Sequence, residues 1–125
     1  MLEFDYIEGE PIIPAILENG NKTLILDFFI DSGADMTMIP LSFARLLGFE
    51  SWKIEEVENA RDAGGGTVPY FVRSVQIIIG NKKLTIRIAC SLQDNVPFLL
   101  GRKDIFDRFQ VCFNDKDKKV VFTEL

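Results

Sequence analysis

Three pairs of short apolar runs, each joined by a tight-turn sequence, constrain the fold of this chain more than any other feature. The runs and their turns are residues 12–17 and 23–30 around Asn19-Gly20-Asn21, residues 75–79 and 84–89 around Gly80-Asn81, and residues 111–113 and 119–122 around Asn114-Asp115-Lys116. Glycine next to asparagine favours a tight turn in the first two pairs, and Asn114-Asp115 are turn-forming residues in the third, so each pair predicts a β-hairpin. Many short strands at this spacing predict an all-β domain, either a closed barrel or a sandwich.

Two segments depart from the strand pattern. Residues 41–47 follow Pro40, carry apolar side chains at helical spacing and end before Gly48, which predicts a short helix. Residues 103–109 also carry apolar side chains at helical spacing and predict a second short helix. Each segment follows a strand-like run that ends in a glycine-containing turn.

Length and charge narrow the possible classes of function. A chain of 125 residues fits one domain, residues 1–125, and a hydrophobic content of 47% predicts that it folds. The net charge of −5 argues against nucleic-acid binding, which needs a basic surface. No apolar run is long enough to span a membrane. The first ten residues are acidic and lack the basic start of a signal peptide, so we expect a cytoplasmic protein.

The residue types that are missing exclude several kinds of chemistry. The chain has no histidine, so neither a Ser-His-Asp nor a Cys-His mechanism is possible. Two cysteines, Cys90 and Cys112, cannot complete a four-ligand structural zinc site, and we expect no metal and no cofactor. Both cysteines lie in strand-like segments and are predicted to be buried free thiols. Carboxylates are therefore the leading candidates for acid–base chemistry.

One carboxylate occupies an unusual position. Asp31 directly follows the apolar run 24–30 and directly precedes Ser32-Gly33-Ala34. An ionised acid at the end of a buried strand is costly unless it is paired or hydrogen-bonded. Asp31 is therefore either the cap of a turn or a working acid.

Three motifs favour the working acid. They are Asp31-Ser32-Gly33-Ala34-Asp35, the glycine-rich segment 63–69 (AGGGTVP), and Phe98-Leu99-Leu100-Gly101-Arg102. In this order and at this spacing the chain resembles the retropepsin-like aspartic proteases, the family of the dimeric retroviral proteases, from about Leu24 to Phe113. The resemblance implies a half-size chain that folds as a closed β-barrel of the acid protease type with one or two short helices.

The resemblance also implies roles for the first motif. Asp31 matches the catalytic aspartate. Ser32 takes the place of a commoner threonine, whose hydroxyl holds the two catalytic loops of a dimer in register. Gly33 matches a glycine that faces the substrate, and Ala34 completes the catalytic loop. Asp35 matches a residue that binds the substrate backbone and pairs with Arg102.

The other two motifs match the parts around the catalytic loop. The flap that closes over a bound peptide corresponds to Gly64, Gly65, Gly66, Thr67 and Val68. The strand that supports the catalytic loop corresponds to Leu99, Leu100 and Gly101, and Arg102 follows it. A run of three glycines in the flap is a departure from the family pattern.

Carboxylate chemistry on a peptide bond needs two acids at one water, one as base and one as acid. This chain supplies a single Asp-Ser-Gly, and the similar strand at residues 98–101 has Leu99-Leu100-Gly101 instead. The sequence therefore predicts an aspartic endopeptidase that is active as a homodimer on an extended peptide or protein substrate. The alternative is a catalytically silent retropepsin-like module that binds peptides or only dimerises. The sequence leaves open whether residues 1–13 or 120–122 join the dimer interface.

Overall fold

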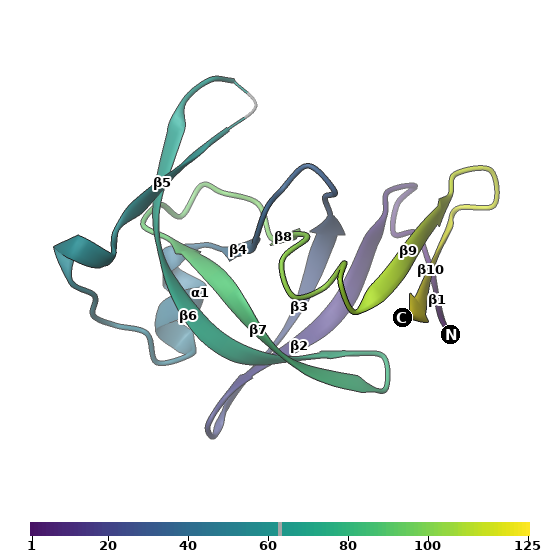
Figure 1. Cartoon of the computed structure of the whole chain (residues 1–125), viewed down its shortest axis with the longest axis horizontal. Coiled ribbons are helices and arrows are strands. Elements are labelled where there is room, and N and C mark those ends of the chain that lie inside the picture. Colours follow the sequence, from purple (N-terminus) through teal and green to yellow (C-terminus); the bar gives the residue numbers. More distant parts are fainter. Residues whose placement is uncertain (63) are drawn as a thin grey trace.

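The structure is a computed structural model that describes residues 1–62 and 64–125, and its regular structure is almost entirely β (Figure 1). The described residues form ten strands: β1 (Leu2–Asp5), β2 (Ile12–Asn19), β3 (Lys22–Ile30), β4 (Thr37–Ile39), β5 (Glu58–Arg61), β6 (Thr67–Ile79), β7 (Lys82–Ser91), β8 (Leu99–Leu100), β9 (Phe109–Asn114) and β10 (Lys119–Glu124). They also form one α-helix, α1 (Leu41–Leu46), and one 3₁₀-helix, η1 (Ile54–Glu56). Neither helix is long or apolar enough to cross a membrane.

Six strands close into a barrel. They follow one another in the order β2-β3-β8-β4-β7-β6, and β2 also pairs with β6 to complete the ring. Strand β5 is added outside the ring, on β6. The barrel interior is filled by fully buried side chains such as Phe28, Ile39, Phe71 and Ile88. The predicted all-β barrel is therefore confirmed.

The three predicted hairpins are present. Gly20–Asn21 connects β2 to β3, Gly80–Asn81 connects β6 to β7, and residues 115–118 connect β9 to β10. Gly20 and Gly80 each have a φ of 60°, a left-handed conformation at the first central position of the turn. Turns of type II′ require this conformation there, and glycine adopts it without steric cost.

A second sheet contains both chain ends, which lie close together in Figure 1. Its strand order is β1-β10-β9, with antiparallel pairing throughout. We call it the terminal sheet. It packs on the β6–β7 hairpin, where the side chain of Leu2 lies 3.0 Å from the position of a Cβ on Gly80. Phe122 of β10 forms edge-to-face contacts with Phe4 and Phe109, at ring distances of 5.8 and 5.6 Å.

The first predicted helix is confirmed as α1, but the second is wrong. Residues 103–108 form successive hydrogen-bonded turns. Asp104 has a φ of 67°, which no right-handed helix accommodates. Its carboxylate accepts hydrogen bonds from the backbone N–H, Nε and Nη2 of Arg87, at 2.9, 3.0 and 2.9 Å. This contact with β7 orders a conformation that the local apolar spacing did not indicate.

The prediction for the cysteines is correct for one of them. Cys90 on β7 is fully buried, whereas Cys112 on β9 is exposed. Cys112 lies opposite Val121 of β10, which in turn lies opposite Glu3 of β1. All three side chains therefore share one face of the terminal sheet, the face opposite to the buried Phe122.

Replacing Asp104 by asparagine should lower the free energy of unfolding at neutral pH. It should also make that free energy less dependent on pH in the acid range. The hydrogen bonds from Arg87 lower the pKa of Asp104. The stabilisation from a carboxyl with a lowered pKa is complete above the unfolded-state value, near 3.9, and is lost as the pH falls through the folded-state value. Asparagine tolerates the left-handed conformation, so the change removes mainly the charge. We expect a loss of about 1 kcal/mol at pH 7.

Urea unfolding at pH 7 and at about pH 3 measures this effect. The difference between wild type and Asp104→Asn should shrink at the lower pH, while the exposed Asp27 of β3, changed to asparagine, serves as the control. An equal loss at both pH values would show that charge pairing is not the cause.

Candidate active site

Asp31 lies in a tight loop at the end of β3. Its backbone N–H donates to the carbonyl of Leu100 on β8 at 3.0 Å. Its Oδ1 accepts the backbone N–H of Gly33 at 2.8 Å, and its carbonyl accepts the N–H of Ala34 at 3.2 Å. The residue is half-buried. One carboxylate oxygen is thus held by the loop itself, which fixes the direction of the side chain.

Residues 100–103 hold the other side of this loop. The Leu100 carbonyl accepts the Asp31 N–H, as described above. In addition, the N–H groups of Arg102 and Lys103 donate to the carbonyls of Ala34 and Asp35 at 3.0 and 2.8 Å. The predicted catalytic loop and the predicted support strand are therefore in direct contact.

Gly101 is the tightest point of this contact. A Cβ at this position would lie 2.3 Å from the carbonyl carbon of Met36, so no other residue fits without backbone movement. The Gly101 N–H donates to Oγ1 of Thr37 at 3.2 Å, and Thr37 is fully buried. The sequence analysis missed Thr37, because a threonine before an apolar strand carries no local sign of a buried partner.

Asp35 and Arg102 form an ion pair between Oδ1 and Nη2, as the family resemblance implied. The side chain of Asp35 is 81% exposed and that of Arg102 is 52% exposed, so solvent screens the pair. The pair accordingly contributes more to orienting these side chains than to overall stability.

The predicted flap is a hairpin of β5 and β6 that projects from the barrel (Figure 1). Ala63, the first residue of the predicted glycine-rich segment, lies outside the described residues. Oδ1 of Asp62 accepts the N–H groups of Gly64 and Gly66 at 3.0 and 2.8 Å, and the Asp62 carbonyl accepts that of Gly65 at 3.1 Å. Asp62, which the sequence analysis missed, therefore organises the tip.

Removing the Asp62 carboxylate should accelerate hydrogen exchange at the flap tip. Asp62→Ala leaves the N–H groups of Gly64 and Gly66 without their acceptor, whereas Asp62→Asn keeps an oxygen in place. Because hydrogen bonds to charged groups contribute about 1.5–3 kcal/mol, less when exposed, we expect exchange about tenfold faster in the alanine variant. NMR measures the rates, with the Gly33 N–H on Asp31 as an internal control. Unchanged rates would mean that Asp62 does not order the tip.

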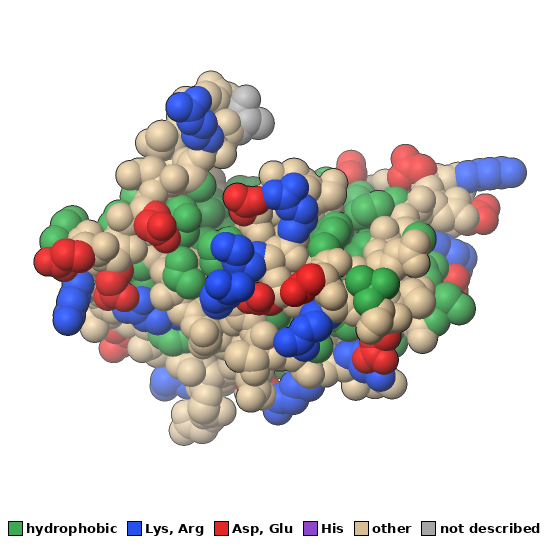
Figure 2. All heavy atoms as spheres, viewed as in Figure 1, with side chains coloured by type: hydrophobic (Ala, Val, Ile, Leu, Met, Phe, Trp, Pro, Cys, Tyr) green, Lys and Arg blue, Asp and Glu red, His purple; other side chains and the backbone are tan. Residues whose placement is uncertain are grey.

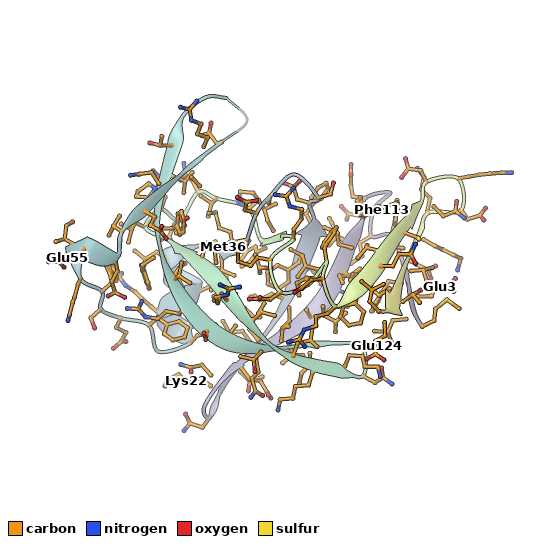
Figure 3. The ribbon with its side chains drawn as sticks, viewed as in Figure 1. Glu3, Lys22, Met36, Glu55, Phe113 and Glu124 are labelled. Carbon is orange, nitrogen blue, oxygen red and sulfur yellow. The ribbon has the colours of Figure 1, made fainter. Side chains whose placement is uncertain are left out.

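A groove of about 950 Å³ lies between the flap hairpin and the catalytic loop. Figure 2 shows hydrophobic surface beneath the projecting hairpin, and Figure 3 labels Met36 there. The lining residues come from the catalytic loop and β4 (Asp31, Gly33, Ala34, Asp35, Met36, Met38), from the flap and β7 (Asn59, Ala60, Arg61, Asp62, Val68, Tyr70, Ala89), and from the segment before and in β8 (Gln93, Asn95, Val96, Pro97, Leu99).

The predicted site residues differ in their relation to the groove. The catalytic loop lines it through Asp31, Gly33, Ala34 and Asp35, and Leu99 and Val68 also line it. The remaining flap residues, Gly64, Gly65, Gly66 and Thr67, are exposed at the tip and do not line it. Ser32 is exposed beside the groove, and Leu100 and Gly101 are buried beneath it. Met36, Met38 and the segment 93–97 were missed, because folding alone brings them to the site.

Two neighbouring groups titrate at high pH. Burial raises the pKa of Tyr70, and the negative charges of Glu58 and Asp35 raise it further, so its phenol stays a proton donor at neutral pH. Burial also raises the pKa of the Cys90 thiol to about 12, which makes it a poor nucleophile. Neither group competes with Asp31 for base chemistry. Within the described residues, no group of three or more potential metal-binding side chains occurs.

Two of the three acids that line the groove are already engaged. Asp35 pairs with Arg102, and Asp62 accepts the flap N–H groups. Asp31 accepts one N–H and, within the described residues, forms no ion pair. Among the acids that line the groove, Asp31 is therefore the one whose carboxylate is least engaged by other described residues.

Comparisons with known proteins agree with this geometry. A family model described as aspartyl protease matches residues 13–103. The structure is similar to the crystal structure of a retropepsin-like aspartic protease from Rickettsia conorii, with a TM-score of 0.65 and 20% sequence identity over 97% of this chain and 88% of that chain. It is also similar to the EIAV protease complexed with the inhibitor HBY-793, with a TM-score of 0.62 and 21% identity over 81% of this chain and 89% of that chain. The curated proteins contain no sequence match. The chain belongs to the aspartyl protease family and has the retropepsin-like fold.

Proposed function

We propose that the protein is a homodimeric aspartic endopeptidase, in which Asp31 of each copy contributes one carboxyl to a shared catalytic pair. The position of Asp31 carries this proposal. It lies at the floor of a groove beneath a flap, it is oriented by the Gly33 N–H, and no cation in the described residues neutralises it.

A single chain lacks the second acid. The strand that approaches the catalytic loop from the other side supplies Leu99, Leu100 and Gly101 instead. A two-fold axis beside the loop would bring Asp31 next to its own copy, as closed symmetric dimers allow. The role of Ser32 follows from the same arrangement, because its exposed hydroxyl is free to bond across such an axis.

The proposed reaction is hydrolysis of a peptide bond. One Asp31 carboxylate takes a proton from water, whose oxygen attacks the peptide carbonyl carbon, while the other Asp31, protonated, donates to the carbonyl oxygen. The tetrahedral intermediate then breaks its C–N bond as the nitrogen receives a proton, which yields a carboxyl and an amine. Two neighbouring acids share one proton in such a pair, so activity depends on pH as a property of the pair.

The groove suggests the class of substrate. Its walls include Met36, Met38, Val68 and Leu99, and it is open to the surface beneath the flap. An extended peptide fits between the flap and the floor, with backbone hydrogen bonds providing affinity and apolar walls accepting apolar side chains. A cytoplasmic location and the lack of nucleic-acid and membrane partners stay predictions from the sequence.

Cleavage of a peptide library by the purified protein, at pH values from about 4 to 7, tests the proposal. Mass spectrometry of the products gives the cleavage sites. The activity per chain should fall on dilution, because only the dimer holds both acids. A confirmed dimer that cleaves no peptide would instead favour the silent peptide-binding or dimerisation module.

A further inference from the structure

The ion pair between Arg87 and Asp104 joins β7 to the segment that holds the catalytic loop. Neither residue is among the described residues that line the groove. Three donors of Arg87, its backbone N–H, Nε and Nη2, bond to the Asp104 carboxylate at 2.9, 3.0 and 2.9 Å. The Asp104 side chain is 20% exposed, compared with 81% for Asp35 in its pair with Arg102. Solvent therefore screens the Arg87 pair less, and several charge-assisted bonds strengthen it.

The pair occupies the edge of β7 beside the start of β4. The parallel pairing of these strands begins with Thr37 opposite Ile88, and Arg87 is the residue just before it on β7. The Asp104 carboxylate accepts the Arg87 N–H there, in place of a neighbouring strand. Figure 1 shows the segment after β8 running beside β7 on its way to β9. Hydrogen bonds thus join β7 to β4, which follows the catalytic loop, and to the segment that supports it.

A short path of backbone hydrogen bonds leads from Asp104 to Asp31. The two residues before Asp104 donate their N–H groups to the carbonyls of Ala34 and Asp35, at 3.0 and 2.8 Å. Ala34 in turn donates its own N–H to the Asp31 carbonyl at 3.2 Å. The position of Asp104 therefore determines where two donors to the loop lie. Because these bonds join backbone atoms, a shift of Asp104 moves the loop rather than one side chain.

Asp104 needs Arg87 to stay in this position. Its φ of 67° is in the left-handed region, which is disfavoured for residues other than glycine and persists where surrounding contacts determine it. Within the described residues, the hydrogen bonds to the Asp104 carboxylate all come from Arg87. A cavity of about 390 Å³ is lined by Arg87, Asp104 and Asp35, among others. The space beside the pair is therefore not filled by side chains that would hold the segment without it.

We propose that Arg87 is a positioning residue for the Asp31 carboxyl, and that it acts through Asp104 and the backbone of residues 102–103. This inference rests on the proposed function, in which the Asp31 carboxyl must be aligned with a water and a peptide carbonyl. A displacement of about 1 Å that originates far from the chemistry can cost about a hundredfold in rate. Because Arg87 does not line the groove, its loss should lower kcat and leave substrate binding nearly unchanged.

Arg87→Gln tests the inference by separating kcat from KM. Glutamine retains the backbone N–H but removes the charge and the guanidinium donors. We expect kcat for a cleaved peptide to fall about tenfold, with KM within about twofold of the wild-type value. Lys83→Gln is the matched control, because Lys83 lies nearer the other end of β7 and pairs with Glu18 of β2 at 2.9 Å. It should leave kcat unchanged, and circular dichroism checks that both variants are folded at the assay temperature.

Asp104→Gly is a second variant, for the case that Arg87→Gln does not fold. Glycine adopts the left-handed conformation without strain but lacks the carboxylate. The value of kcat should again fall about tenfold. The double variant Arg87→Gln with Asp104→Gly should lose no more than the larger single effect, because each change removes the same contact. Losses that multiply would show that the two residues act separately and would overturn the proposed path.

Hydrogen exchange reports on the loop without any cleavage. The Gly33 and Ala34 N–H groups both donate to Asp31. In Arg87→Gln and in Asp104→Gly, NMR should show that these two groups exchange about fivefold faster than in the wild type. Lys83→Gln should leave both rates unchanged. An ion pair that only stabilised the fold would lower the melting temperature and would not change these rates.

The outcomes separate this inference from the proposed function. If the wild type cleaves peptides and Arg87→Gln changes neither kcat nor the exchange rates, the positioning role is overturned and the proposed protease stays in place. A rise in KM alone would also overturn it, because Arg87 would then act on substrate binding. Faster exchange at Gly33 and Ala34 in a protein that cleaves no peptide would support the positioning of the Asp31 loop and would count against the proposed function.

Discussion

Replacing Asp31 by asparagine should abolish peptide cleavage and leave the fold unchanged. The two side chains have the same shape, and the Gly33 N–H, now 2.8 Å from Oδ1, retains an oxygen to donate to. A carboxamide, however, neither takes a proton from water nor gives one to the peptide carbonyl. We expect kcat/KM to fall by at least about a thousandfold, which corresponds to about 4 kcal/mol of transition-state stabilisation.

Asp27→Asn is the matched control for this variant. Asp27 lies on the same strand, β3, but is exposed and does not line the groove. Cleavage by the control at the wild-type rate, together with none by Asp31→Asn, would assign the activity to Asp31. Cleavage by the Asp31 variant at a wild-type rate would exclude Asp31 as the catalytic acid.

Replacing Gly101 by alanine should destabilise the protein more than any other single methyl addition in the site. The new Cβ would lie 2.3 Å from the carbonyl carbon and 2.4 Å from the carbonyl oxygen of Met36. These are backbone atoms, which cannot rotate away as the end of a side chain can. Relief requires β8 and the Met36 backbone to separate, which also breaks the buried bond from Gly101 to Thr37. Overpacking and the lost hydrogen bond together should cost about 3 kcal/mol or more. The melting temperature should fall by about 10 °C.

Gly64→Ala is the control for Gly101→Ala. Its new Cβ would meet only Oδ1 of Asp62, at 3.5 Å, an ordinary contact. Differential scanning calorimetry should detect almost no change for this variant. Thr37→Val, which keeps the shape but removes the Oγ1 acceptor, should show the hydrogen-bond part of the loss alone. If Gly101→Ala had the same melting temperature as the wild type, the close approach of Gly101 to the Met36 backbone would be disproved.

The parts of the fold that the sequence predicts are those determined by local chemistry. The hairpin turns at Gly20 and Gly80 depend on glycine at one position, and helix α1 on Pro40 and Gly48 at its ends. Asp31 is recognisable because a carboxylate after an apolar strand is unusual and two further motifs accompany it. The turns, the helix ends and each of the three motifs are short stretches of sequence, so each can be recognised locally.

The parts that the sequence does not predict depend on distant contacts. The apolar spacing of residues 103–109 favours a helix, but Arg87 of β7 binds Asp104 and stabilises its left-handed backbone. Thr37 supports the site only because the distant Gly101 N–H donates to its Oγ1. Met36 and Met38 line the groove only once the barrel closes. Cys112 is exposed because its side chain lies on the face of the terminal sheet opposite to the buried Phe122, and only the pairing of distant strands sets that face.

The two-residue strand β8 also bears on how the protein reaches its native state. Leu99 pairs with Phe29 and with Met38, so β8 inserts between two strands formed early in the chain, far away in sequence. Contacts of long sequence separation form slowly, because the loop between them must close first. The hairpins can form rapidly on their own, whereas the Leu100 carbonyl reaches the Asp31 N–H only after β8 has inserted. During refolding, we expect strand signals in circular dichroism to recover before the catalytic loop becomes ordered.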